Sequence, residues 1–253
     1  TPPKPELLNI LALSPDARFV IYKAWPDVEA GSNTPYGVLM VSRLDRSETK
    51  PIPGTEGAIE GALSADGRWV AFIAARDRAR TRVSLKKIAL ENGQPAGTPV
   101  TLCDLPSSGD SFVCWSSDRD LVIAQSWNQT ILTVPASGGE PRVILRDEAA
   151  AGVDNWGDVR PLVPGRSVLA SRWALSGQTI RERTEIVDLA DGKRTPLIDN
   201  AGGTQYLPSG HLIARRSANS LIVVRFDLES RNLTGEPVTV WNGGQLNGFF
   251  VST

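Results

Sequence analysis

Short apolar runs alternate with turn residues along the whole chain, and the pattern is clearest at 63–74. There, residues 63–68 (LSADGR) lead into the apolar run 69–74 (WVAFIA). Asp66 can bond to its own backbone, and Gly67 accepts a positive φ without a side-chain clash. The run that follows is rich in β-branched and aromatic residues. The unit therefore predicts a tight turn followed by a β-strand.

The same unit returns at intervals of about 40 to 50 residues. A close copy stands at 13–22 (LSPDARFVIY), and weaker copies stand at 115–123, 162–169 and 207–213. Several short strands per repeat at this period are typical of a β-propeller. The sequence therefore predicts an all-β fold, a ring of four-stranded blades that forms a single domain over 1–253.

Five complete blades and the first strand of a sixth are predicted. The blades cover approximately 8–57, 58–107, 108–150, 151–200 and 201–242. Residues 243–253 form either a partial blade or a closing strand. Gly, Asn and Asp suit the hairpins between the third and fourth strands, which are 45–47, 91–93, 136–139, 190–192 and 229–232. Unpaired strand edges in an incomplete ring could also join two chains.

Composition and charge narrow the range of partners. Hydrophobic residues make up 41% and charged residues 22% of the 253 residues, as in an ordinary globular protein. A net charge of −1 argues against nucleic acid and anionic membranes, which are normally recognised through a basic face. No apolar run reaches the length of a membrane span, and the first residues lack the features of a signal peptide. Any targeting segment or membrane anchor is expected outside these residues.

The cysteines and the histidine do not suggest catalysis or a bound cofactor. Cys103 and Cys114 cannot by themselves form a tetrahedral zinc site. They are predicted on an outer strand and the next inner strand, usually too far apart for a disulfide, although a bridge stays an alternative. The single histidine, His211, has only Ser209 as a nearby nucleophile, without a spacing argument for a triad. No catalytic residue, metal or cofactor is therefore expected.

Several segments resemble a known family. They are 14–18 (SPDAR), 64–68 (SADGR), 53–57 (PGTEG), 101–104 (TLCD) and 134–141 (VPASGGEP). Together they are similar to TolB-like propellers of PD40 (WD40-like) repeats, and more narrowly to the propeller of many bacterial serine/threonine protein kinases. The turn chemistry is weaker in blades three to five, and rings of this family typically have six or more blades. The kinase motifs themselves are absent from the sequence.

This resemblance implies a non-catalytic propeller that binds a small molecule or a protein at its face. It would be the sensor region of a larger bacterial signalling protein such as a serine/threonine kinase. This region would be extracytoplasmic, either in the periplasm or at the cell surface. The parent protein could be membrane-anchored elsewhere. Two alternatives stay open: the gating propeller of a prolyl-oligopeptidase-type hydrolase, and a TolB-like envelope scaffold.

Ligands of propellers usually gather at the central channel, which the first strand of each blade and the preceding loop line. The residues expected at this channel mouth are Glu60, Asp110, Asp154, Trp156, Asp158, Gln205 and Asn247. The carboxylates among them could hold a hard cation or a basic peptide, and the tryptophan offers a flat apolar face. The alternative is that these residues are solvated loop ends or bond to neighbouring backbone.

The densest polar patch is 154–158 (DNWGD). The spacing of Asp154 and Asp158 superficially resembles a calcium loop. The residue order of such a loop and its distal glutamate are missing. A structural cation at this patch is therefore only a weak motif match, and no metal is expected there.

Overall fold

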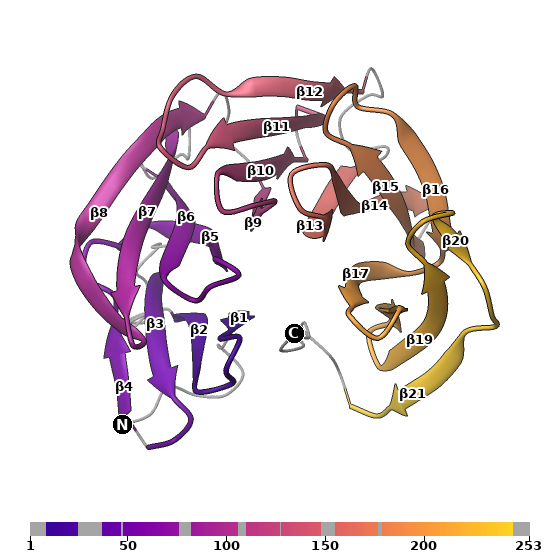
Figure 1. Cartoon of the computed structure of the whole chain (residues 1–253), viewed down its shortest axis with the longest axis horizontal. Coiled ribbons are helices and arrows are strands. Elements are labelled where there is room, and N and C mark those ends of the chain that lie inside the picture. Colours follow the sequence, from indigo (N-terminus) through magenta and orange to yellow (C-terminus); the bar gives the residue numbers. More distant parts are fainter. Residues whose placement is uncertain are drawn as a thin grey trace.

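The protein was analysed as a computed structural model, which describes residues 9–24, 37–46, 48–75, 82–105, 110–126, 128–147, 155–176 and 179–244. Within these residues every named element is a β-strand. This part of the chain has no helix long and apolar enough to cross a membrane. The strands form five sheets around a central channel, in a ring that is open between the first and the last sheet (Figure 1). The predicted all-β propeller is confirmed.

Each blade is an antiparallel meander with its first strand at the channel and its fourth at the periphery (Figure 1). Blade 1 holds β1 (Asn9–Leu13), β2 (Phe19–Ala24), β3 (Val38–Arg43) and β4 (Glu48–Pro51). Blade 2 holds β5 (Ala58–Leu63), β6 (Trp69–Ala75), β7 (Val83–Glu91) and β8 (Gln94–Leu105). Blade 3 holds β9 (Ser111–Trp115), β10 (Asp120–Gln125), β11 (Thr130–Pro135) and β12 (Arg142–Arg146).

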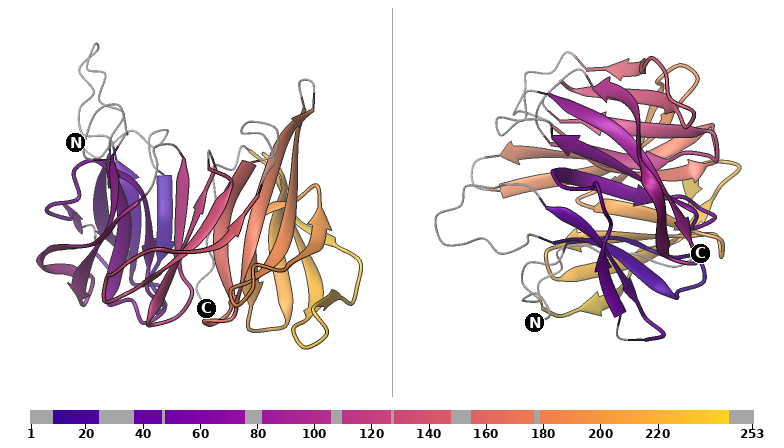
Figure 2. Two further views of the ribbon diagram at one scale, coloured as in Figure 1. Left: turned by 90° about the horizontal axis from the view of Figure 1, so that it is seen from above. Right: turned by 90° about the vertical axis from the view of Figure 1, so that its left-hand side faces the viewer.

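The last blade differs from the other four in having a fifth strand. Blade 4 holds β13 (Asn155–Val163), β14 (Ser167–Ser176), β15 (Thr179–Asp188) and β16 (Arg194–Asp199). Its β14 and β15 form a long hairpin that extends beyond one face of the ring (Figure 2). Blade 5 holds β17 (Gly202–Leu207), β18 (His211–Ser217), β19 (Ser220–Asp227), β20 (Asn232–Leu233) and β21 (Val238–Asn242). The last two strands pair with opposite ends of β19 and divide its outer edge between them.

The core consists of apolar layers between neighbouring blades. Successive residues of a strand point to opposite faces of the sheet. On β10, Leu121 and Ile123 therefore pack toward blade 2, whereas Val122 and Ala124 pack toward blade 4. Similar layers join blade 1 to blade 2 and blade 4 to blade 5. Because both faces of an inner blade are buried, its strands read as continuous apolar runs.

The repeated Ser-x-Asp sequence closes the turn between the first and second strands. The hydroxyl of Ser14 donates to the Asp16 carboxylate over 2.7 Å and accepts a bond from the backbone N–H of Phe19 over 3.0 Å. The hydroxyl of Ser64 donates to Asp66 in the same way, over 2.6 Å. The bond from Ser14 lowers the pKa of Asp16. The strongest repeat signal in the sequence is thus a side-chain network that fixes a hairpin.

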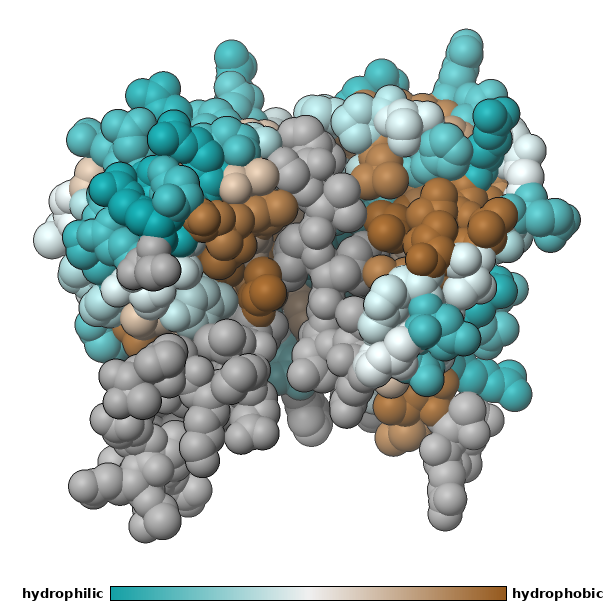
Figure 3. All heavy atoms as spheres, turned by 90° about the horizontal axis from the view of Figure 1, so that it is seen from below, coloured by the Kyte–Doolittle hydropathy of each residue, from teal (hydrophilic) through white to brown (hydrophobic). Residues whose placement is uncertain are grey.

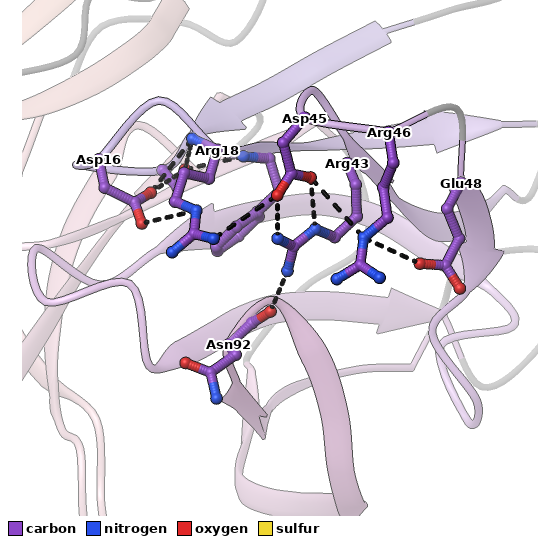
Figure 4. A network of polar contacts seen from close by, with 9 residues as sticks. Asp16, Arg18, Arg43, Asp45, Arg46, Glu48 and Asn92 are labelled. Carbon is purple, nitrogen blue, oxygen red and sulfur yellow. Dashed lines mark hydrogen bonds and ion pairs between the residues drawn. The ribbon is translucent and has the colours of Figure 1, made fainter.

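The turn between the third and fourth strands of blade 2 is bonded to blade 1 through Arg43 (Figure 4). The buried guanidinium donates from Nε and Nη2 to the two carboxylate oxygens of Asp45, over 2.8 and 2.5 Å. Its Nη1 donates to the carbonyl oxygen of Asn92 in blade 2, over 2.7 Å. The hydrogen bonds from Arg43 lower the pKa of Asp45 to about 2. One arginine therefore joins two adjacent blades.

Arginines make comparable contacts at other blade junctions. The Arg142 Nη2 of blade 3 donates to the carbonyl oxygen of Leu189, at the end of the third strand of blade 4, over 3.1 Å. Arg231 lies in the turn between β19 and β20 of blade 5. Its Nη1 atom lies 2.8 Å from both carboxylate oxygens of Asp188 in blade 4. Polar contacts at these turns thus supplement the apolar layers in fixing one blade on the next.

Candidate functional site

The inner strands of all five blades line a cavity of about 300 Å³, close to the turns that follow them. Its walls are largely apolar, with one charged side chain, that of Arg160. The lining residues include Leu13, Pro15, Ala62, Ala65, Cys114, Trp115, Arg160, Leu162, Gln205 and Tyr206. A concave, mostly apolar wall with few polar groups is typical of small-ligand sites.

Charged side chains from three blades interact beside this cavity. Arg160 Nε donates to Asp158 Oδ2 over 2.9 Å, both on β13. Lys23 of β2 donates from Nζ to the carbonyl oxygen of Ile59 on β5, over 2.6 Å. Glu60, the next residue on β5, interacts electrostatically with Lys23, Asp158 and Arg160. The channel thus brings blades 1, 2 and 4 into one charged cluster, defined here as Lys23, Glu60, Asp158 and Arg160.

Glu60 titrates near neutral pH in this cluster. Burial raises the pKa of its carboxyl group to about 7, because desolvation disfavours the charged form. The ammonium group of Lys23 and the backbone N–H of Gly61 oppose this rise. Strongly perturbed carboxyl groups beside a cleft are concentrated at functional sites. We therefore take the charged cluster and the adjoining cavity as the candidate site.

Irregular strand pairing positions the polar channel residues. The pairing of β5 with β6 shifts register between Ala58 and Glu60. The pairing of β13 with β14 shifts between Trp156 and Val159, a stretch that includes Asp158. The inner strand of blade 5 has a similar shift that ends at Gln205. Bulges of this kind turn a side chain away from the regular alternation, and they are common beside functional sites.

The structure brings together three of the residues expected at the channel. Glu60 and Asp158 belong to the charged cluster, and Gln205 lines the cavity. Asp110 is exposed just before β9, and its carbonyl oxygen accepts a hydrogen bond from the backbone N–H of Ser126 over 3.0 Å. The other two polar candidates, Asp154 and Asn247, lie outside the described residues.

Trp156 does not offer a flat face to a ligand. Its side chain is fully buried in the layer between blades 3 and 4. The guanidinium of Arg172, itself buried, lies 4.6 Å from the centre of its ring, in cation–π geometry. The prediction of a binding role for this residue is therefore wrong. The register shift that follows Trp156 separates it from the channel-facing Asp158.

Two members of the site were missed from the sequence, Lys23 and Arg160. Lys23 lies on a second strand, whereas the channel was expected to be lined by first strands and the loops before them. Arg160 follows Asp158 by two residues on a first strand, so the alternation of a β-strand could have indicated it.

The charged cluster does not have the character of a cation site. Its carboxylates, Glu60 and Asp158, are balanced by the cationic groups of Lys23 and Arg160. Among the described residues, no group of three or more His, Cys, Asp or Glu side chains could hold a metal ion. The cluster contains both cationic and anionic side chains, and one of its carboxyl groups has a pKa of about 7. Such a cluster fits a ligand that itself accepts and donates hydrogen bonds.

The remaining reactive side chains lie apart from the cavity or are unreactive within it. The Nδ1 atom of His211 lies 3.0 Å from the carbonyl oxygen of Ser209, in an exposed turn of blade 5. Cys103 and Cys114 are free thiols on β8 and β9, as their predicted strands favour. Burial raises their pKa values to about 11 and about 12, so neither is a thiolate at neutral pH.

Comparison with known proteins finds likeness in structure rather than in sequence. No family model and no curated protein matches the chain. Among solved structures, TolB from Acinetobacter baumannii matches with a TM-score of 0.61 at 13% sequence identity, over 93% of this chain and 55% of that one. The chain is a TolB-like β-propeller in fold.

Enzymes contain similar propellers. An oligogalacturonate lyase from Vibrio parahaemolyticus matches with a TM-score of 0.57 at 12% identity, over 91% of this propeller and 64% of the lyase. Prolyl oligopeptidase B from Galerina marginata matches with a TM-score of 0.57 at 13% identity, over 92% of the propeller and 34% of the peptidase. The propeller thus spans less than two thirds of each of these proteins. At such identities the likeness shows the fold alone.

Proposed function

We propose that this propeller is a non-catalytic binding module whose channel receives the carboxylate-bearing part of a small ligand. The observation that carries the proposal is the charged cluster, in which three blades place two cations and a carboxyl group of pKa about 7 beside an apolar cavity. No single blade supplies this arrangement, so binding would depend on the assembled ring.

The charge of the cluster favours an anion below neutral pH. When Glu60 is protonated, the positive charges of Lys23 and Arg160 outweigh the negative charge of Asp158. A ligand carboxylate would then meet cationic donors, and charge-assisted hydrogen bonds of this kind are stronger than neutral ones. The apolar walls would contact the rest of the ligand. An acidic sugar is a suitable first probe, since one structural neighbour is an oligogalacturonate lyase.

A calorimetric titration of the full chain tests this proposal. The probe is digalacturonate, and lactose is the uncharged disaccharide control. We expect digalacturonate to bind more tightly at pH 6 than at pH 8, and lactose not to bind. Arg160→Gln should weaken binding by about tenfold, because it removes a charged donor. Arg146→Gln, at an exposed position on the outer strand β12, should leave binding unchanged. Equal binding of both sugars, or of neither, would contradict the proposal.

We further propose that the module is the extracytoplasmic sensor region of a larger bacterial signalling protein such as a serine/threonine kinase. The support is the sequence resemblance of its turns to kinase-associated propellers. The full-length gene tests this directly: it should encode a kinase domain and a membrane helix before the propeller. A gene without them would contradict the kinase assignment and leave the binding module to be assigned to another parent.

A peptidase propeller is the second candidate, favoured by the structural likeness to prolyl oligopeptidase B. In that case the full-length protein should contain an α/β-hydrolase domain with a Gly-x-Ser-x-Gly nucleophile elbow. The likeness to TolB leaves a scaffold role in the cell envelope as a third possibility, in which a protein rather than a small molecule would occupy the ring face.

A further inference from the structure

The channel cavity has two chemically different ends. At one end, Arg160 and Gln205 lie on the first strands of blades 4 and 5. The other end is lined by exposed residues from the turns that follow the first strands of four blades, Pro15, Ala65, Pro164 and Pro208. A strand rises about 3.3 Å per residue, so Arg160 and Pro164, four residues apart, lie about 13 Å apart along the channel. The cavity is thus long enough to hold a ligand with a polar and an apolar end.

Two polar groups in the apolar part of the cavity are already engaged within the protein. The Ser64 hydroxyl donates to the Asp66 carboxylate over 2.6 Å and accepts a bond from the backbone N–H of Trp69 over 2.9 Å. The indole Nε1 of Trp115 donates to the carbonyl oxygen of Ala62 over 3.1 Å. A ligand hydroxyl placed here would therefore give up its bonds to water and find few partners in exchange, which weakens binding.

The apolar part of the cavity is built from three blades. Trp115 of β9, Leu162 of β13 and Tyr206 of β17 all line it. The Tyr206 ring packs edge-on against Phe226, with the ring centres 6.1 Å apart. A dry apolar cavity of roughly 150 Å³ takes up benzene, and this cavity holds about 300 Å³. It therefore has room for an apolar body of about two rings.

We propose that the ligand of the channel is an amphiphilic carboxylate, with one acidic group on an aromatic or alkyl body of about two-ring size. The carboxylate would lie at Arg160, and the body between Trp115, Leu162 and Tyr206. This inference rests on the proposed anion site and goes beyond it, because it ranks an apolar carboxylate above an acidic sugar. A sugar acid would also satisfy Arg160, but it would bring hydroxyl groups into the apolar part.

Equilibrium dialysis of the full chain at pH 6 tests this inference with three probes. The amphiphilic carboxylate is 2-naphthoate, galacturonate is a polar carboxylate of similar size, and 2-naphthamide is the uncharged counterpart of the first. We expect 2-naphthoate to bind more tightly than galacturonate by about tenfold or more, because only its body suits the apolar wall. We expect 2-naphthamide to bind about tenfold more weakly than 2-naphthoate, because it lacks the charge that strengthens the bond to Arg160.

Leu13→Gln tests the apolar wall, because Leu13 is half-buried and lines the cavity. It should weaken the binding of 2-naphthoate by about tenfold and that of galacturonate far less. An apolar probe could also adhere to exposed apolar surface, such as the patches at both sides of the ring opening in Figure 3. Val238→Gln is the control, because Val238 is 62% exposed on β21, the strand beside the opening in Figure 1. It should leave both affinities unchanged.

Circular dichroism shows whether each variant is folded, and the comparison of probes in the unsubstituted protein needs no variant. Galacturonate that binds as tightly as 2-naphthoate, and loses binding in Arg160→Gln, would overturn this inference and leave the anion site standing. Binding of neither carboxylate would overturn both. Equal binding of 2-naphthoate and 2-naphthamide would overturn the inference, as would 2-naphthoate binding that a folded Leu13→Gln variant leaves unchanged.

Discussion

Glu60 makes the stability of this fold depend on pH between about 4.5 and 7. Its carboxyl pKa is raised to about 7, so the folded protein binds the proton more tightly than the unfolded chain. The sign follows from this: the protonated form contributes its full stability below pH 4.5, and that contribution is lost as the pH rises from 4.5 to about 7. Above this window the ionised carboxylate is a constant cost to the folded state.

Glu60→Gln should therefore remove part of the pH dependence of stability. We expect the variant to match the unsubstituted protein near pH 4.5 and to exceed its free energy of unfolding at pH 8 by up to about 3 kcal/mol. Urea denaturation at the two pH values measures this difference. Glu229→Gln, at an exposed position in a turn of blade 5, is the control. Parallel pH profiles for Glu60→Gln and the unsubstituted protein would contradict the assignment.

The sequence also shows why single site residues are harder to predict than strands. Trp156 and Asp158 are two apart on one strand, so simple alternation places them on the same face. The register shift between Trp156 and Val159 separates them, and the tryptophan is buried between blades. Gly157 is the local signal of this shift, because a glycine inside a strand often marks a bulge. Glu60 and Gln205 also lie at register shifts, yet Glu60 is part of the charged cluster and Gln205 lines the cavity.

At the scale of elements, glycines in the outer hairpins of blades 2, 3 and 4 lie close to the preceding blade. Gly192 has φ +74°, and a Cβ there would lie 2.5 Å from the carbonyl oxygen of Ile144 in blade 3. Gly93 has φ +73° and packs in the same way against Phe19 of blade 1. The hairpin glycines that indicate turns in the sequence therefore have a second role in packing the blades together.

Gly192→Ala should be more destabilising than Gly97→Ala. Both glycines have positive φ, so each substitution forces alanine into a left-handed conformation that costs about 1–2 kcal/mol. Only Gly192 also faces a neighbouring backbone, whereas nothing lies within 4 Å of the Cβ position of Gly97. We expect an additional loss of roughly 2 kcal/mol for Gly192→Ala, measured by denaturant unfolding. Equal losses would show that the hairpin does not fix the distance between blades.

Turn chemistry made most strands predictable, with limits that are physical. The Ser-x-Asp turns mark where the second strands of blades 1 and 2 begin, since β2 starts at Phe19 and β6 at Trp69. The length of the hairpin of β14 and β15 has no such signal, because residues 176–179 (SGQT) resemble a loop. The strand β20 was predicted as part of a turn, since two residues give no periodic signal.

At the scale of the whole molecule, the ring creates the site. Lys23, Glu60 and Arg160 come from blades 1, 2 and 4, which are brought together only at the channel. The fold of the ring could be predicted from repeats, because each blade uses the same local rules. The charged cluster could not, because it depends on which residues of different blades lie at the same depth of the channel.

Proton uptake on ligand binding is the most direct test of this account. Calorimetric titrations of digalacturonate at pH 7, in two buffers of different ionisation enthalpy, give the number of protons taken up. Because Glu60 has a pKa of about 7, an anion that favours its protonated form should draw in up to about half a proton per site. The uptake should vanish in Glu60→Gln. Binding without proton uptake, or uptake that persists in Glu60→Gln, would contradict a proton-linked anion site in the channel.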